Sequence, residues 1–400
     1  MMTRPVDVRV TDRATGMPLP TAQVIWNESR RATTDQAGIA SLPASGGCCH
    51  RDLESLIVWH PQYRPYYLRI LGGWQEGRDG TLAVQMERLT PPEDGIGWGI
   101  RAVGAMAARH LAYECVRVAV LDTGVDWWNP CLNVRGGFDA FRPGEPGQRR
   151  SRLASSHGTF CAGIIGGRRV AQQGICGVLP GVPVYDLAVF DGQAEDAPSA
   201  AIASGVRWAI QNGIQVLNIG IGSREPKPME EDAYREAWEA GVVLVAPAGN
   251  SDDGRHEVMY PAQYPYTIAV TAIGLAEAIT DEPRRISHDG KNRFPDFNCY
   301  QRGIDLAAPG VEIYSVAPGV KRGETAYDCC TGTSEAACFV TGAAAAVLAA
   351  HPGLTRDRGA QTPETVRRIL RDTAIPLGFG EEREGAGLVN VVNAAARGRD

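Results

Sequence analysis

From about Gly95 onward, short apolar runs alternate with segments of helix length, and this alternation constrains the fold more than any other feature. The predicted strands are VRVAVLD, VPVYDLAVF, IQVLNIGI, VVLVAPA, YTIAVTAI and IDLAAPG. The predicted helices between and after them are SHGTFCAGIIGG, SAAIASGVRWAIQNG, EEDAYREAWEAG and SEAACFVTGAAAAVLAAHP. Apolar strands separated by crossover helices predict an α/β fold with a doubly wound, mainly parallel sheet of about six or seven strands.

The first 90 residues have a different sequence pattern. Between Val6 and about Leu89, β-prone runs alternate with turn sequences and leave no room for a long helix. This pattern predicts about seven strands in a compact antiparallel sandwich. The stretch PPEDGIG that follows is typical of a linker. We therefore expect a β-sandwich accessory domain over 1–90, a linker over 91–97 and an α/β domain over 98–400.

Composition argues against several classes of partner. The net charge of -6 leaves no basic field for nucleic acid. The N-terminus does not read as a secretory signal, and no apolar run reaches the ~20 residues that cross a bilayer, so we expect a cytoplasmic protein without a membrane partner. The ten cysteines include two adjacent pairs, Cys48/Cys49 and Cys329/Cys330, and no CxxC motif, which favours free thiols over disulfides or a zinc site.

Three residues stand where the predicted elements could support catalysis. Asp122 follows the apolar run VRVAVL, at the end of a strand where open α/β sheets place their ligand sites. His157 begins a helical segment, and Ser334 follows a Gly-Thr turn before an Ala-rich helix. Taken alone, each residue also fits a structural role. Asp122 would be a turn carboxylate, His157 a capping or core histidine, and Ser334 an N-cap residue. Together they supply the nucleophile, the base and the orienting carboxylate that acyl transfer requires.

Longer motifs surround these residues. VAVLDTGVD, HGTFCAG, VLNIGIGS, VAPAGN and GTSEAA occur in the order and at the spacing found in subtilases, and DLAAPGVEIYS and GAGLVNVVNA extend the match. From about Gly95 to its C-terminus the chain therefore resembles the subtilisin-like serine peptidases, whose triad also runs Asp, His, Ser. More loosely, the N-terminal domain resembles the prealbumin-like, carboxypeptidase-regulatory-like sandwiches attached to many bacterial enzymes.

The resemblance implies a serine endopeptidase. Ser334 would attack the scissile carbonyl, His157 would accept and return its proton, and Asp122 would orient His157. The side-chain amide of Asn250, in VAPAGN, would face the oxyanion together with the backbone N–H of Ser334. In any other context, Asn250 would be interpreted as a turn residue.

The resemblance also implies that substrate binds as an extended strand. The segments 218–222 and 246–249 would line the cleft and offer backbone groups to the peptide. The candidate substrate-binding residues in these segments are Asn218, Gly220, Gly222, Ala246, Ala248 and Gly249. Met259 would form the floor of a shallow apolar pocket for the residue before the cut bond, although a core methionine is an equal alternative.

The residue after the nucleophile departs from the family pattern. Most subtilases read GTSMA where this chain reads GTSEA, so Glu335 directly follows Ser334. An acid at this place could raise the pKa of His157 or bind a basic group in the leaving segment. Alternatively, Glu335 is a salt-bridged residue that the helix dipole favours.

Other departures lie outside the triad. Phe160 replaces a second histidine, Cys161 replaces a valine, and Cys338 replaces a proline. The loop RRVAQQGICGV is short and lacks the oxygen donors of the calcium site that many subtilases carry. We therefore expect no cofactor, with calcium as the alternative although its usual site is degraded.

Several functions remain open at this point. The leading hypothesis is a selective intracellular processing protease. The same triad would serve a peptide transpeptidase or macrocyclase, and a catalytically silent scaffold could use the cleft to bind a peptide; a lipase is disfavoured by the order of the triad. We expect the N-terminal domain to be a retained module for substrate or partner recognition, with a propeptide cut near Glu93 to Gly97 as the alternative.

Overall fold

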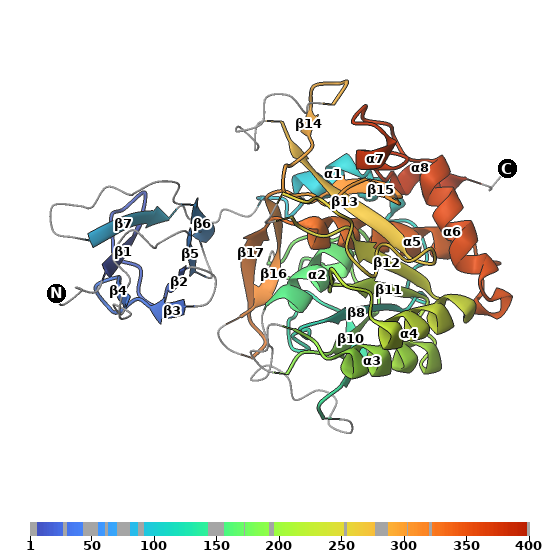
Figure 1. The fold of residues 1–400 in the computed structure, drawn as a ribbon, viewed down its shortest axis with the longest axis horizontal. Coiled ribbons are helices and arrows are strands. Elements are labelled where there is room, and N and C mark those ends of the chain that lie inside the picture. Colours follow the sequence, from blue (N-terminus) through green and yellow to red (C-terminus); the bar gives the residue numbers. More distant parts are fainter. Residues whose placement is uncertain are drawn as a thin grey trace. The chain divides into compact units, whose positions relative to one another are not determined.

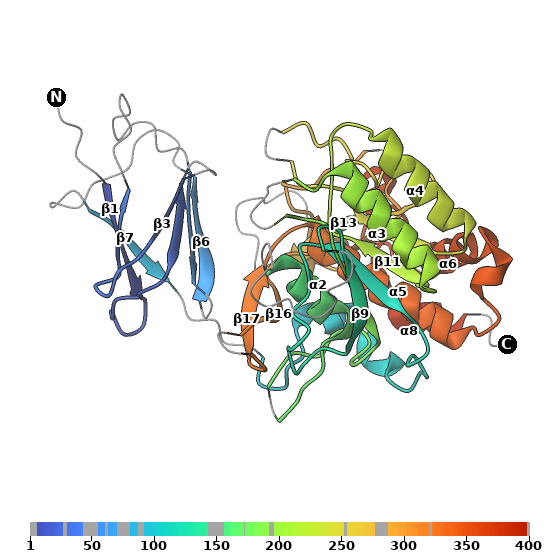
Figure 2. The same cartoon turned by 90° about the horizontal axis from the view of Figure 1, so that it is seen from below.

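A computed structural model describes residues 6–26, 30–42, 55–60, 63–69, 81–86, 92–142, 156–171, 173–191, 196–251, 254–276, 287–301, 303–319 and 322–397. The chain forms two compact units, one from residues 1–90 and one from most of residues 91–400. Figures 1 and 2 show the elements of each unit from two directions. Cys48 and Cys49 lie outside the described residues.

The described part of the smaller unit consists of strands in two sheets (Figure 1). One sheet has the order β4 (Ile39–Leu42), β1 (Val6–Asp12), β7 (Thr81–Met86). The other has the order β3 (Arg30–Thr33), β2 (Gln23–Trp26), β5 (Ser55–His60), β6 (Tyr63–Arg69). Alternate apolar residues of both sheets share one buried cluster, which includes Val8, Val10, Val24, Leu56 and Val58. The period-two patterning of the sequence therefore builds this core.

The prediction of a purely antiparallel arrangement is wrong for one strand pair. β1 and β7 run parallel, in a register that pairs Asp7 with Thr81 and Asp12 with Met86. Parallel neighbours require a long crossover connection. Here the four strands of the other sheet lie between β1 and β7 in the sequence and supply that crossover. The resemblance to prealbumin-like modules stays a prediction.

The larger unit is built on an eight-stranded sheet. Its order is β14 (Asn292–Arg293), β13 (Ile268–Leu275), β12 (Val243–Pro247), β11 (Val216–Ile219), β8 (Val118–Asp122), β10 (Val184–Ala188), β9 (Val134–Asp139), with β15 (Leu306–Pro309) also paired to β13. The pairings are parallel except that of the short β14. From β8 the chain builds first toward β9 and β10 and then, on the other side, toward β11, β12 and β13. This reversal confirms the predicted doubly wound sheet and makes the end of β8 a switch point.

Helices cover both faces of this sheet (Figure 2). α3 (Ser199–Gln211) and α4 (Pro228–Glu239) pack together on one face, and α2 (His157–Gly166) and α5 (Thr333–Ala350) contact each other on the opposite face. Ala119 and Leu121 of β8 belong to the core beneath α3 and α4. Because strand side chains alternate between faces, the side chain of Asp122 belongs to the face of α2 and α5.

α5 is the central helix of the unit. It is long and apolar enough to cross a membrane, but 83% of its apolar window is buried inside the protein. Its alanines and Gly342 allow close packing, since a β-carbon at Gly342 would lie 2.5 Å from Val178. Its composition therefore reflects a core position.

Several elements of the larger unit were missed by the sequence analysis. These are β9, the sheet of β16 (Ile313–Pro318) and β17 (Thr325–Cys330), and the helices α1 (Trp98–Ala102), α6 (Gln361–Asp372), α7 (Glu381–Glu384) and α8 (Val391–Ala396). The sequences of β9 and α6 are rich in charged residues or glycine, so they lack a continuous apolar run. In the predicted linker, the carbonyl of Gly95 accepts a hydrogen bond from the Cys176 N–H (2.7 Å) and so is held by the larger unit.

Candidate active site

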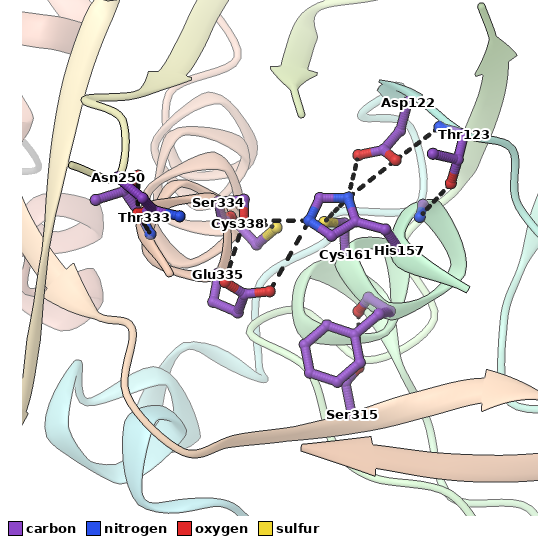
Figure 3. Close-up of polar contacts among 12 residues, drawn as sticks. Asp122, Thr123, His157, Cys161, Asn250, Ser315, Thr333, Ser334, Glu335 and Cys338 are labelled. Carbon is purple, nitrogen blue, oxygen red and sulfur yellow. Dashed lines mark hydrogen bonds and ion pairs between the residues drawn. The ribbon is translucent and has the colours of Figure 1, made fainter. Parts of the chain in front are cut away.

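His157 lies between Asp122 and Ser334 (Figure 3). Its Nδ1–H donates to both carboxylate oxygens of Asp122, at 2.9 and 2.8 Å. Its Nε2 lies 3.1 Å from Ser334 Oγ. The fold thus brings together three side chains that are separated in the sequence by 35 and 177 positions. This is the geometry of a nucleophile, a base and a carboxylate that fixes the tautomer of the base.

Each of these residues stands at the end of a regular element. Asp122 ends β8 at the switch point, His157 begins α2, and Ser334 is the second residue of α5. α2 approaches the β8 turn closely because Gly158 has no side chain; a β-carbon there would lie 2.5 Å from the Gly124 carbonyl oxygen. The triad therefore rests on two packed helices and a buried strand, and on no long loop.

Main-chain groups hold the carboxylate of Asp122 and the turn that follows it. Asp122 is almost fully buried and accepts a hydrogen bond from the Thr123 N–H at 2.6 Å. Thr123 Oγ1 in turn accepts from the N–H of Gly158, at 3.1 Å, which ties the β8 turn to the start of α2. A side chain at Gly220 would overlap the Asp122 carboxylate, so this glycine provides the space that the carboxylate occupies.

The charge of Asp122 stabilises the protonated form of the His157 ring. Burial lowers the pKa of His157, but the charge of Asp122 outweighs this effect and holds the pKa well above its usual value. The side chain of His157 is still 31% exposed, so the ring can be reached from solvent. The Asp122 and His157 pair can therefore stabilise an imidazolium once a proton arrives from Ser334.

Asn250 follows β12 and the positive-φ residue Gly249, and lies exposed beside the start of α5. Its Oδ1 accepts two hydrogen bonds from Thr333, one from the N–H and one from Oγ1, both at 3.1 Å. Because the oxygen is occupied, the Nδ2 donors point away from Thr333, toward the side of Ser334 (Figure 3). A β-carbon built on Gly332 would lie 3.1 Å from Asn250 Nδ2 and 3.5 Å from Ser334 Oγ. The amide of Asn250 and the hydroxyl of Ser334 therefore face the same small space beside Gly332.

The carboxylate of Glu335 also faces the space beside Gly332. Its side chain is buried, with 2% of the residue exposed, and its Oε2 accepts a hydrogen bond from Ser334 Oγ at 3.1 Å. Its Oε1 lies 3.9 Å from His157 Nε2. Burial raises the pKa of the Glu335 carboxyl, and the nearby imidazole partly opposes this shift. Among the described residues no lysine or arginine pairs with Glu335, which disfavours its interpretation as a salt-bridged helix residue.

The hydroxyl of Ser334 therefore has two acceptors. His157 Nε2 and Glu335 Oε2 both lie 3.1 Å from Oγ, and a single hydroxyl proton can serve only one of them at a time. When the Ser334 hydroxyl donates its proton to Glu335, it does not donate to His157, so the proton is not positioned for transfer to the base. The carboxylate consequently competes with the base for the nucleophile.

The predicted cleft residues divide into two groups. Asn218, Ala246 and Ala248 are buried, and Asn218 Oδ1 accepts a hydrogen bond from Thr341 at 2.8 Å. The backbones of Asn218 and Ala246 are paired within the sheet. Asn218 has parallel neighbours on both sides, whereas Ala246 is paired only with β13, and the role of these residues in substrate binding stays a prediction. Gly222, by contrast, is exposed.

Met259 fills the space between two glycines. A β-carbon at Gly249 would lie 2.6 Å from Met259 Cγ, and one at Gly222 would lie 3.5 Å from its Sδ. The Met259 N–H donates to the Ala248 carbonyl at 2.8 Å, and the side chain is half-buried at the edge of the core. Met259 therefore lies between Gly222 and Gly249, and its role as the floor of an apolar pocket stays a prediction.

Two residues in the site had been noted only as departures from the family pattern. Cys161 lies one helical turn after His157, with its Sγ 3.8 Å from His157 Nδ1. Cys338 lies one turn after Ser334, and its thiol donates to the Ser334 carbonyl at 3.2 Å. The spacing of four residues along each helix is the sequence signal that could have identified both positions.

Comparison with known proteins agrees with this architecture. A model of the subtilase family matches residues 114–394. Subtilisin BL from Lederbergia lenta is 36% identical over 304 residues, which cover 76% of this chain and 99% of that protein. An alkaline protease from Alkalihalobacillus alcalophilus is 36% identical over 311 residues, 77% of this chain and 72% of that protein. Subtilisin from Bacillus pumilus is 36% identical over 304 residues, 75% of this chain and 98% of that protein.

Proposed function

Because the chain belongs to the subtilase family and is a subtilisin-like serine endopeptidase, we propose that Ser334, His157 and Asp122 form its catalytic triad. The observation that carries this assignment is the bridge through His157, which reaches Asp122 with one ring nitrogen and Ser334 with the other. A transpeptidase or macrocyclase would use the same triad, whereas a catalytically silent scaffold would bind a peptide without cutting it.

The first chemical step is the attack of Ser334 Oγ on the scissile carbonyl carbon. His157 Nε2 accepts the hydroxyl proton, and Asp122 holds Nδ1–H and stabilises the imidazolium that forms. The imidazolium then protonates the leaving amine and an acyl-enzyme remains. Water, deprotonated by the same histidine, attacks the ester and releases the new carboxyl end.

The negative charge on the former carbonyl oxygen requires donors. Asn250 Nδ2 and the backbone N–H of Ser334 supply them. Ser334 lies in the first turn of α5, where backbone N–H groups have no partner within the helix. The two bonds from Thr333 to Asn250 Oδ1 keep the amide oriented before substrate arrives, so little reorganisation is needed during the reaction.

The substrate is proposed to be a protein or peptide segment that binds in extended form along residues 220–222. Met259 supports a preference for a small residue before the cut bond, because its side chain already occupies the space between Gly222 and Gly249. A restricted pocket favours selective processing over general degradation. The smaller N-terminal unit is proposed to be a retained recognition module for substrate or for a partner protein.

An intracellular location fits the cysteine chemistry. Cys161 and Cys338 are both buried free thiols. A reducing compartment keeps such a pair in the thiol form. We therefore propose the cytoplasm as the site of action and no nucleic acid, membrane or obligatory cofactor as a partner.

One experiment separates hydrolysis from the alternatives. Purified protein and its Ser334→Ala variant are incubated with a peptide library in ¹⁸O-labelled water, with and without an added peptide amine, and the products are identified by mass spectrometry. Hydrolysis predicts ¹⁸O in the new carboxyl ends, small residues before the cuts, and no products from Ser334→Ala. Products joined to the added amine in place of ¹⁸O would establish transpeptidation, and an absence of cleavage with retained peptide binding would establish a scaffold.

A further inference from the structure

The backbone that carries Asn250 is held by a second segment of main chain. On one side of Asn250, the N–H of Ser251 donates to the Phe297 carbonyl at 2.6 Å. On the other side, the carbonyl of Gly249 accepts from the Cys299 N–H at 2.9 Å. The proposed oxyanion residue therefore lies in a short antiparallel contact, with a backbone hydrogen bond before it and another after it.

Asn298 lies opposite Asn250 in this antiparallel bridge and is anchored to the sheet. It is fully buried, its Oδ1 accepts from the Ala272 N–H at 3.2 Å, and its Nδ2 donates to the Ala272 carbonyl at 2.7 Å. The side-chain amide thus makes the bonds to β13 that a neighbouring strand would make, beyond the point where β12 ends at Pro247. The core sheet therefore fixes Asn298, and Asn298 supports Asn250.

His256 contacts both segments of the bridge. Its Nδ1 lies 2.8 Å from the Asn298 carbonyl oxygen, and because a carbonyl can only accept, Nδ1 carries the proton and donates it. The backbone N–H of His256 donates to Ser251 Oγ at 3.2 Å, and its carbonyl accepts from the Tyr300 N–H at 2.8 Å. The ring also stacks on Tyr300, with centroids 5.0 Å apart. One residue thus joins the segment of Asn250 to the segment of Asn298.

The backbone conformation of His256 is a separate observation that draws attention to its side chain. Its φ is 57°, in the left-handed region that glycine adopts freely and that is unfavourable for a residue with a β-carbon. A glycine would provide the same N–H and carbonyl without this cost. The histidine adds only its ring, which bonds to Asn298 and stacks on Tyr300.

We propose that His256 is a positioning residue for the oxyanion site. It holds the bridge between Asn250 and Asn298, so that Asn250 Nδ2 stays directed toward the side of Ser334 (Figure 3). Thr333 orients the amide of Asn250 through its Oδ1, whereas His256 fixes the backbone from which that amide extends. His256 takes no chemical part in the reaction and acts through Asn250. The inference therefore rests on the proposed function, in which Asn250 stabilises the oxyanion.

Two substitutions separate the contribution of the ring from that of the backbone. His256→Gly removes the ring and relieves the left-handed conformation, so the fold should be retained, which thermal melting checks. Its kcat should fall by about tenfold, with little change in KM, because a displaced oxyanion donor is lost mainly in the transition state. His256→Asn places an amide nitrogen the same number of bonds from the backbone as Nδ1 and tolerates the left-handed conformation, so its kcat should stay within about threefold of the unchanged protein.

The matched control is His110→Ala. His110 Nδ1 lies 2.8 Å from the carbonyl oxygen of Ala107, so this ring also bonds to a backbone carbonyl, but on an exposed turn. Its loss should leave kcat and KM unchanged. An equal fall of kcat in His110→Ala and His256→Gly would overturn the inference.

A double-mutant cycle determines whether the effect of His256 passes through Asn250. In the Asn250→Leu protein the donor is already absent, so adding His256→Gly should lower kcat by less than about twofold. Equal losses from His256→Gly in both backgrounds, or an unchanged kcat in His256→Gly alone, would overturn the inference. An unchanged kcat in Asn250→Leu alone would contradict the proposed oxyanion site and the inference with it. Because that arm leaves His256 intact, the two failures are distinguishable.

Discussion

Gly158, the residue after the proposed base, packs its α-carbon directly against the main chain of Gly124 in the turn that follows Asp122. A β-carbon at Gly158 would lie 2.5 Å from the Gly124 carbonyl oxygen, too close for any side chain, and the Gly158 N–H donates to Thr123. This contact sets the distance between α2 and β8, and with it the bond between His157 and Asp122.

The first prediction concerns this contact. Gly158→Ala must push α2 away from the turn, and a displacement of about 1 Å at the triad should lower kcat/KM by about 100-fold. The strain should also cost about 1 to 3 kcal/mol in the free energy of unfolding. Steady-state kinetics and thermal melting measure the two effects. Gly353→Ala is the control, since a β-carbon there meets nothing within 4 Å; equal losses in both variants would contradict the assignment.

The second prediction concerns the oxyanion. Asn250→Leu removes the Nδ2 donor while keeping a side chain of similar size, so kcat should fall by about 10² to 10³ with little change in KM. That magnitude is known from the equivalent experiment on subtilisin. Thr333→Val, which removes one of the two bonds that orient Asn250, should give a smaller loss in kcat. A rise in KM with unchanged kcat would instead show that Asn250 binds substrate in its ground state.

The third prediction is a pH dependence set by Glu335. Burial raises the pKa of its carboxyl, which is neutral below that pKa and ionised above it. An ionised carboxylate opposes the charge that develops beside Asn250 and competes for the hydroxyl of Ser334. Unit charges about 4 Å apart interact by about 4 kcal/mol at an effective dielectric constant of 20. The ratio of kcat for Glu335→Gln to kcat for the unchanged protein should therefore rise with pH, by at least about tenfold.

The measurement for this prediction is a pair of pH–rate profiles from acid to alkaline conditions. Because Glu335 Oε1 lies 3.9 Å from His157 Nε2, the substitution also shifts the titration of His157, so the two rates are compared at pH values above that titration in both proteins. A ratio that falls as pH rises would mean that the carboxylate assists the reaction, as it would if it bound a cationic group of the leaving segment.

The fourth prediction concerns the pocket that Met259 occupies. Met259→Ala should open the space between Gly222 and Gly249 and raise kcat/KM by about tenfold or more for peptides with leucine or phenylalanine before the cut bond. Peptides with alanine there should change little. Met229→Ala, on the exposed surface of α4, is the matched control. An unchanged preference would assign Met259 to the core alone.

The order of elements and the members of the site were predictable to different degrees. The apolar runs that became β8, β11, β12 and β13 and the helices α2 and α5 follow directly from the periodicity of the sequence, and Asp122 lies at the strand end where the motif placed it. Burial of Asn218 was not predictable, because it depends on β8 and β12 lying on both sides of β11.

Contacts between elements distant in the sequence were the hardest to foresee. The parallel pairing of β1 with β7 depends on a crossover through a whole sheet, which no local pattern encodes. The hydrogen bond between His157 and Ser334 depends on how closely α2 approaches α5. The motif GTSEAA showed that Glu335 is adjacent to Ser334, but only the structure shows that its carboxylate turns back to the nucleophile.

The central claim is that His157 activates Ser334 as a nucleophile, and covalent labelling tests it most directly. The protein and its Ser334→Ala variant are treated with a fluorophosphonate, which phosphonylates an activated serine with loss of fluoride, and intact masses and labelled peptides are measured. We predict one phosphonyl group, on Ser334, and none in the variant. Unlabelled protein that still cleaves peptides, or equal labelling of both proteins, would contradict the assignment of Ser334.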